Sequence, residues 1–295
     1  MRFLAKYAIC LAIIFFGSSV YSQSTNSNCP LVIKTAAIDG GVMSYLEGGK
    51  GESVLLLHGL FAQKEQWTEV ACALANQGFA VIVPDLPGYG ASTGYQVSDY
   101  PLESQVRILQ QLMASKAVGR FHIAGSSMGG TISALYAKQY PNQIKSLAFI
   151  GAPMGIISWS PQVKDAIFHG VNPFIPTSEQ QFDAEMALLF YHPPIVDSAI
   201  KAQLLKEYRD NNHHYQQVWD IVNFYDRALD GVPVATPRTL ILWGRQDGIF
   251  NIAGLTPLKR RYLNSQAYVF PDAAHLLMLE DPQKVIEMYG SFLKR

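Results

Sequence analysis

The sequence is poor in charge and nearly devoid of cysteine. Only 16% of its 295 residues are charged, and 23 Lys and Arg residues balance 23 Asp and Glu residues. So few charges beside 49% hydrophobic residues exclude a disordered polyampholyte and predict a globular chain with a buried core. A net charge of zero also argues against a nucleic-acid partner, which would call for a basic patch.

Metal sites and membrane-spanning helices are lacking as well. The adjacent His213 and His214 have no array of Cys or carboxylate residues at ligand spacing beside them, so no metal is expected. Beyond the N-terminal segment, no apolar stretch is long enough to cross a bilayer.

The first 22 residues have the pattern of a secretory signal peptide. Two basic residues precede an uncharged run over 7–16, and Val20 and Ser22 supply tolerated residues before a cleavage site. We predict cleavage after Ser22 and export to the periplasm or beyond the cell. The alternative is an uncleaved N-terminal anchor, because the run from 3 to 20 is nearly long enough to span hydrocarbon.

Cleavage would leave two cysteines, Cys29 and Cys72. In an oxidising compartment these two residues could form a disulfide. Cys72 also lies in a helical pattern and could be a buried free thiol, so the sequence leaves both states open.

Short apolar runs alternate with amphipathic stretches along most of the chain. Strands are expected at 54–57, 79–83, 121–124, 147–150, 239–243 and 267–270. Apolar residues at helical spacing lie between them, around 67–74, 102–113 and 132–136, and again at 285–292. Continuous apolar strands alternating with helices predict an α/β protein with a mostly parallel, doubly wound sheet.

One region departs from this alternation. Residues 154–232 contain no strand-like run, and their apolar residues follow helical faces. We predict a helical cap inserted between two strands, over the carboxyl ends of the sheet, where ligands bind in such folds. The core would comprise 23–153 and 233–295. The apolar cap is also a candidate for peripheral contact with a membrane.

The candidate nucleophile is Ser127. Residues 125–129 read Gly-Ser-Ser-Met-Gly, which fits G-x-S-x-G, and they follow the expected strand 121–124 and open a helical pattern. The small residues allow a sharp, strained turn that exposes the serine. The N-terminus of the following helix would favour negative charge developing there.

A serine hydroxyl needs a base that takes its proton and a carboxylate that orients the base. His275 follows the last expected strand, and Asp247 follows the strand 239–243, in the order Ser, Asp, His. Asp272 lies too close to His275 in sequence to reach round to its Nδ1. The remaining histidines are expected to be structural or at the surface: His58, His122, His169, His192, His213 and His214.

Two backbone N–H groups should bind the oxyanion. Met128 directly follows the nucleophile, and Leu60 lies in the loop after an early strand, with Phe61 the second choice in that loop. Phe61 and the cap residues Met186 and Phe190 are candidates for contact with the substrate.

From about Val42 to its end, the chain resembles the α/β-hydrolase-fold serine hydrolases, and among them the capped monoacylglycerol lipases and carboxylesterases. The motifs that carry this resemblance are His58-Gly59, Asp85-Leu86-Pro87-Gly88-Tyr89-Gly90, the turn at 125–130, Trp243-Gly244-Arg245-Gln246-Asp247 and Ala274-His275. Serine rather than aspartate at position 127 argues against the dehalogenases and epoxide hydrolases of this fold.

The resemblance implies hydrolysis of a small-molecule ester or lipid through an acyl-enzyme intermediate, without a metal or organic cofactor. The same triad would serve a carbon–carbon bond hydrolase, an aminopeptidase or an acyltransferase. A non-catalytic binding protein of this fold would have no need of the triad.

Overall fold

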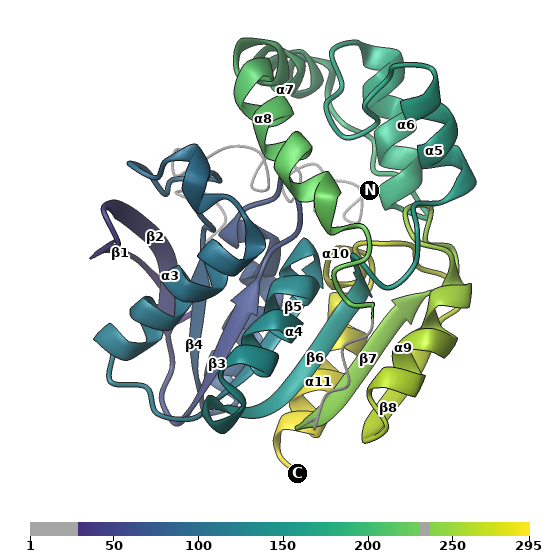
Figure 1. The fold of residues 1–295 in the computed structure, drawn as a ribbon. Coiled ribbons are helices and arrows are strands. Elements are labelled where there is room, and N and C mark those ends of the chain that lie inside the picture. Colours follow the sequence, from purple (N-terminus) through teal and green to yellow (C-terminus); the bar gives the residue numbers. More distant parts are fainter. Residues whose placement is uncertain (1–28, 231–236) are drawn as a thin grey trace.

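The computed structural model describes residues 29–230 and 237–295, so the predicted signal peptide or anchor at 1–22 lies outside the described residues. Eight strands form one sheet in the order β1-β2-β4-β3-β5-β6-β7-β8 (Figure 1). The strands are β1 (Val32–Ile38), β2 (Gly41–Gly48), β3 (Glu52–Leu57), β4 (Phe79–Pro84), β5 (Phe121–Ser127), β6 (Ile144–Pro153), β7 (Arg238–Gly244) and β8 (Ser265–Phe270).

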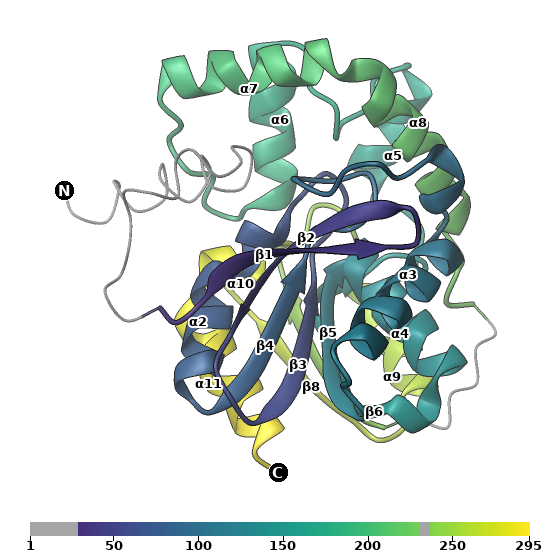
Figure 2. The same ribbon diagram turned by 90° about the vertical axis from the view of Figure 1, so that its left-hand side faces the viewer.

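Strands β3 to β8 run parallel to one another, as the apolar runs predicted. Helices cover both faces of this sheet, and a separate apolar cluster fills the space on each side (Figure 2). On one face lie α2 (Thr68–Asn76), α10 (Leu277–Glu280) and α11 (Pro282–Leu293). On the other lie α3 (Leu102–Ser115), α4 (Met128–Gln139) and α9 (Leu255–Arg261). The sheet is therefore doubly wound, in agreement with the prediction.

An antiparallel hairpin, β1–β2, extends one edge of the sheet and was absent from the sequence prediction. Asp39 and Gly40 form its two-residue turn, and both have positive φ angles, 52° and 85°. An Asp-Gly pair is a strong hairpin signal, because both residues tolerate the left-handed backbone conformation that this turn requires. Strand β1 is largely exposed, so it lacks the continuous apolar run by which the buried strands were identified.

Four helices lie between β6 and β7, where the cap was predicted. They are α5 (Pro161–Phe168), α6 (Glu179–Leu189), α7 (Ser198–Asp210) and α8 (Asn212–Val222). They lie together beyond one end of the sheet in both views (Figures 1 and 2). Polar side chains fix the starts of three of them: Ser160, Ser178 and Asp197 each accept hydrogen bonds from backbone N–H groups in the first turn.

Five short 3₁₀ helices complete the described elements: η2 (Lys64–Trp67), η3 (Val97–Asp99), η4 (Pro141–Gln143), η5 (Asn223–Tyr225) and η6 (Ile252–Gly254). Across 29–230 and 237–295, none of the helices is both long and apolar enough to span a bilayer. Cys29 and Cys72 form a disulfide, with their Cα atoms 5.0 Å apart. It ties the segment before β1 to α2, and resolves the question that the sequence left open.

Candidate active site

Ser127 ends β5 and immediately precedes α4, in a backbone conformation that non-glycine residues rarely adopt. Its φ and ψ angles are 52° and −120°. Other backbone segments approach Gly125 and Gly129 so closely that no side chain would fit at either position. A Cβ atom on Gly125 would lie 2.2 Å from the backbone of Gly129, and one on Gly129 would lie 2.3 Å from the carbonyl oxygen of Leu57. This is the strained strand-to-helix turn that the G-x-S-x-G pattern predicted.

His275 and Asp247 meet as a hydrogen-bonded pair, 2.9 Å apart between Nδ1 and Oδ2. The other carboxylate oxygen of Asp247 accepts hydrogen bonds from the backbone N–H groups of Ile249 and Phe250, at 2.9 Å each. Both side chains are buried. When Nδ1 donates its hydrogen to the carboxylate, the neutral imidazole keeps its lone pair on Nε2, the nitrogen that can accept a proton.

Ser127 and His275 line one cavity of about 60 Å³ between the sheet and the cap helices. Asp247 lies behind His275 and does not line it. The predicted residues Leu60 and Phe61 also line the cavity. The complete lining consists of Gly59, Leu60, Phe61, Ala62, Gln66, Ser127, Met154, Trp159, Phe174, Glu185, Leu189, Tyr208, Ile249, His275 and Leu276.

The predicted substrate contacts Met186 and Phe190 lie outside this lining. Both are buried in the apolar cluster on the α2 side of the sheet. Glu185 and Leu189, one position earlier on the same stretch, line the cavity instead. One position is about 100° around a helix axis, so the sequence located the right segment of α6 but not the side that faces the cavity.

The cap is hydrogen-bonded to the loops that carry the candidate acid and base. The carbonyl oxygen of Leu189, the last residue of α6, accepts hydrogen bonds from the backbone N–H groups of His275 and Leu276, at 3.1 and 3.3 Å. The hydroxyl of Ser160 donates to the carbonyl oxygen of Gly248, at 2.6 Å. These bonds fix the cap helices against the loops around His275 and Asp247.

Glu280 makes a second connection of this kind, which the sequence did not reveal. One of its carboxylate oxygens accepts a hydrogen bond from the N–H of Ala274, at 2.6 Å, and the other accepts one from Tyr191, at 2.7 Å. Burial raises the pKa of Glu280, and the backbone donors oppose that rise. Glu280 is therefore a positioning residue that joins the His275 loop to the end of α6.

The loop after β3 offers backbone donors to the cavity. The N–H of Gly59 donates to the side-chain oxygen of Gln66, at 3.2 Å, and the N–H of Ala62 donates to Gly59, at 3.3 Å. Within the described part of the chain, the N–H groups of Leu60 and Phe61 have no hydrogen-bond partner. Phe61 also has a positive φ angle of 54°. Of the two oxyanion donors predicted from the sequence, Leu60 and Met128, Leu60 lies in this loop, as does the second choice, Phe61.

His58, at the end of β3, holds this loop against the strand β4. Its Nδ1 donates to the carbonyl oxygen of Gly59, at 2.8 Å, and its Nε2 accepts from the N–H of Leu86, at 3.0 Å. Burial lowers the pKa of His58 to about 4, so the ring is neutral in this arrangement. His58 is thus structural, as the sequence predicted.

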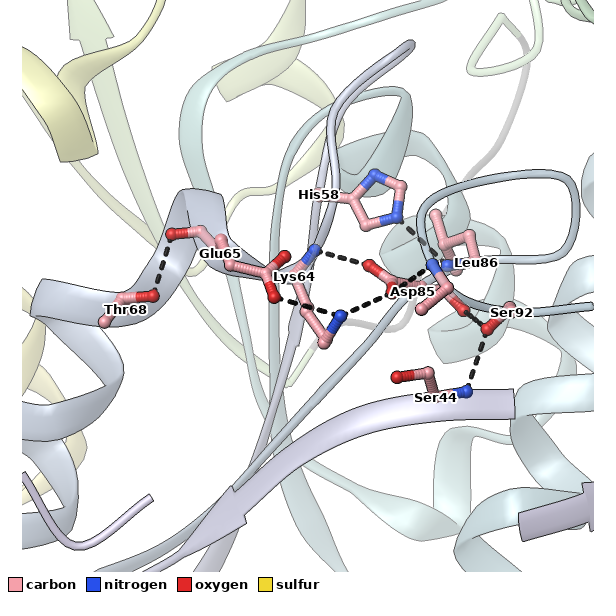
Figure 3. Close-up of polar contacts among 9 residues, drawn as sticks. Ser44, His58, Lys64, Glu65, Thr68, Asp85, Leu86 and Ser92 are labelled. Atoms are coloured by element: carbon pink, nitrogen blue, oxygen red, sulfur yellow. Dashed lines mark hydrogen bonds and ion pairs between the residues drawn. The ribbon is translucent and has the colours of Figure 1, made fainter. Parts of the chain in front are cut away.

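A buried ion pair lies beside His58 (Figure 3). The ammonium of Lys64 contacts Asp85 at 2.7 Å and Glu65 at 3.0 Å, and the backbone N–H of Lys64 donates to the other oxygen of Asp85. Burial alone would lower the pKa of Lys64, but the two carboxylates outweigh it and raise that pKa. Asp85 therefore anchors the start of η2 beneath the loop.

The remaining histidines mostly fit their predicted structural or surface roles. His169, His192 and His213 are exposed, and His122 is buried in β5. His214 differs from the predicted surface position: it is half-buried, with Nε2 2.7 Å from the carbonyl oxygen of Gly88. In residues 29–230 and 237–295, no three His, Cys, Asp or Glu residues are grouped so as to hold a metal ion.

Known proteins share this architecture. The family described as alpha/beta hydrolase fold matches residues 52–188. Lipase 1 of Psychrobacter immobilis is 28% identical over 277 residues, which cover 92% of this chain and 86% of that protein. Monoacylglycerol lipase ABHD6 of Rattus norvegicus is 27% identical over 261 residues, 83% of this chain and 76% of that protein. The structure of lip1 from Acinetobacter baumannii AYE superposes with a TM-score of 0.77 at 30% identity, covering 90% of this chain and 92% of that one.

Proposed function

Because the chain belongs to the α/β-hydrolase-fold family, we propose that it is a serine hydrolase that cleaves carboxylic esters, with Ser127, His275 and Asp247 as its triad. One observation carries the proposal. The strained serine at the end of β5 and the histidine paired with Asp247 line the same cavity. The names of the relatives support the substrate class, since one is a lipase and another a monoacylglycerol lipase.

In the proposed reaction, the hydroxyl oxygen of Ser127 attacks the ester carbonyl carbon while Nε2 of His275 takes the hydroxyl proton. Asp247 stabilises the imidazolium that forms. The N–H groups of Leu60 and Met128 bind the oxyanion of the tetrahedral intermediate. The intermediate then collapses, and the departing alcohol receives the proton from His275. Water repeats these steps on the acyl-enzyme and releases the carboxylic acid.

The proposed substrates are esters of apolar acyl groups such as monoacylglycerols. The cavity lining supports this, since Met154, Trp159, Phe174 and Ile249 present apolar surface close to Ser127. We also propose that the protein acts after export. The signal-peptide pattern of 1–22 and the disulfide between Cys29 and Cys72 both fit an oxidising compartment.

Product analysis tests the proposal. The purified protein is assayed against p-nitrophenyl butanoate, a monoacylglycerol and an aminoacyl p-nitroanilide. We expect carboxylic acid to be released from both esters, with little cleavage of the anilide. Cleavage of the anilide without ester hydrolysis would contradict the proposal and favour an aminopeptidase. An acyl ester formed with an added alcohol, in place of free acid, would favour an acyltransferase.

A further inference from the structure

The cavity that holds Ser127 and His275 is largely apolar but contains one acidic side chain, Glu185 of α6. The amide oxygen of Gln66, another polar group in the lining, already accepts the N–H of Gly59. Glu185 has no role in the proposed mechanism.

Glu185 is buried, and within the described part of the chain one of its two carboxyl oxygens lacks a hydrogen-bond partner. The residue is only 3% exposed, and the oxygen concerned is Oε2. Among the described residues no basic side chain offsets the loss of water, and burial raises the pKa of Glu185 to about 8. At neutral pH the carboxyl group therefore carries its proton, and can both donate and accept a hydrogen bond.

None of the charged groups in 29–230 and 237–295 forms an ion pair with Glu185. Tyr208 lines the same cavity, and Tyr215 and Glu207 lie near enough to Tyr208 to affect its pKa. Burial raises the pKa of both tyrosines, which keeps them uncharged. A polar group left unsatisfied in such a place costs free energy that an apolar side chain of similar size would not. A ligand that satisfies the carboxyl group would recover that cost.

We propose that Glu185 is a specificity residue that hydrogen-bonds a free hydroxyl group of the substrate near the scissile ester, so that hydroxylated esters are preferred over plain alkyl esters. This inference rests on the proposed ester hydrolysis. An uncharged carboxyl group suits an uncharged partner that also donates and accepts, which is the chemistry of a hydroxyl group. The hydroxyl could belong to the alcohol portion, as in a partial acylglycerol, or to the acyl portion.

The test compares four short esters of matched size: monobutyrin, propyl butanoate, propyl 3-hydroxybutanoate and butyrylcholine. The variants are E185L and E185M, which remove the hydrogen bond, and E185Q, which keeps a neutral donor and acceptor. E207L, on the neighbouring helix and outside the cavity lining, is the matched control. Thermal unfolding identifies variants that fold, and either apolar variant suffices.

In E185L or E185M, kcat/KM for a hydroxylated ester divided by that for propyl butanoate should fall about tenfold, roughly the worth of one buried hydrogen bond. E185Q should retain most of the preference, and E207L all of it. A loss confined to monobutyrin places the hydroxyl in the alcohol portion, and a loss confined to propyl 3-hydroxybutanoate places it in the acyl portion.

Unchanged ratios for both hydroxylated esters in a folded apolar variant would overturn the inference and leave ester hydrolysis standing. The inference would also be overturned if kcat/KM for butyrylcholine fell more than kcat/KM for the other esters, because the partner of Glu185 would then be a cation. If the wild-type protein hydrolysed none of the four esters, the proposed function itself would fail.

Discussion

Both carboxylate oxygens of Asp247 accept hydrogen bonds. It accepts from two backbone N–H groups through one oxygen and pairs with His275 through the other. The first two bonds orient the carboxylate, and the third fixes which nitrogen of His275 carries the hydrogen. The role proposed for Asp247 is thus to maintain one tautomer of the base.

Replacing Asp247 with asparagine tests this role. The amide group can present its N–H to Nδ1 and favour the wrong tautomer, so kcat should fall by about 10³–10⁴ with the fold intact. Steady-state hydrolysis of p-nitrophenyl butanoate gives the value. Asp272→Asn is the control, because Asp272 is exposed and close to His275 only in sequence. Near-normal turnover of the Asp247 variant would mean that another carboxylate orients His275.

The buried environment of Lys64 leads to a prediction about the free energy of unfolding. Its ammonium is 2% exposed and contacts two buried carboxylates. Lys64→Met would leave Asp85 and Glu65 unpaired in the interior, which should lower the free energy of unfolding by about 3–5 kcal/mol. Lys34→Met removes a lysine that is 50% exposed and paired with Glu47, and should cost at most about 1 kcal/mol. Equal urea midpoints for the two variants would contradict this account of the ion pair.

At the scale of elements, the apolar runs predicted strands β3 to β8 but not the hairpin of β1 and β2. Strands β3 to β7 were foreseen because a strand covered on both faces must be continuously apolar. The half-buried edge strand β8 was recognised from the short apolar run at its end. The exposed strand β1 has no such apolar run, and the only sequence signal for its hairpin is the turn pair Asp39 and Gly40. The sequence thus located the elements whose burial leaves a pattern.

In the candidate site, residues next to predicted strands could be predicted from the sequence, whereas the orientation of cap residues could not. Ser127, Asp247 and His275 were predictable because each lies at the carboxyl end of a strand or in the loop after it, and these ends of parallel strands lie along one edge of the sheet. Cap residues have no such constraint, since their direction depends on how α6 rotates against the core. That is why Met186 and Phe190 were chosen over Glu185 and Leu189. Glu280 was missed because its role depends on a tertiary contact with Tyr191.

The disulfide between Cys29 and Cys72 is the element-scale feature open to direct measurement. It closes a loop with a sequence separation of 43 residues, which in the chain-entropy model stabilises the fold by roughly 3–4 kcal/mol. We expect the double variant Cys29→Ala and Cys72→Ala to unfold at a clearly lower urea concentration than the oxidised protein. Two reactive thiols in the denatured wild-type protein, purified from the periplasm, would show that the bridge does not form there.

For the molecule as a whole, the central feature is a small cavity between the sheet and the cap helices. The cap helices cover the carboxyl ends of the strands, and Leu189 and Ser160 bond them to the loops that carry His275 and Asp247. A cavity of about 60 Å³ is well below the ~150 Å³ that encloses one benzene molecule. A long acyl chain therefore either extends out of this cavity or requires side chains of the cap to move.

Chain-length dependence tests that movement. If the cap yields, kcat/KM for p-nitrophenyl esters should rise from acetate to medium chains, since each methylene buried against the apolar lining is worth ~0.8 kcal/mol. The rise should end in a plateau when the pocket is full. The series is assayed from two to sixteen carbons below micelle-forming concentrations. A steady fall beyond acetate would show that the cavity stays closed and that the substrates are small esters.

Covalent labelling tests the proposal that Ser127 is the nucleophile. The folded protein is treated with a fluorophosphonate, and the modified residue is mapped by mass spectrometry. We predict one label per chain, on Ser127, with no label on a folded Ser127→Ala variant. Ser126→Ala, which alters the buried neighbouring serine, should still be labelled. A label on any other residue, or on the folded Ser127→Ala protein, would contradict the account.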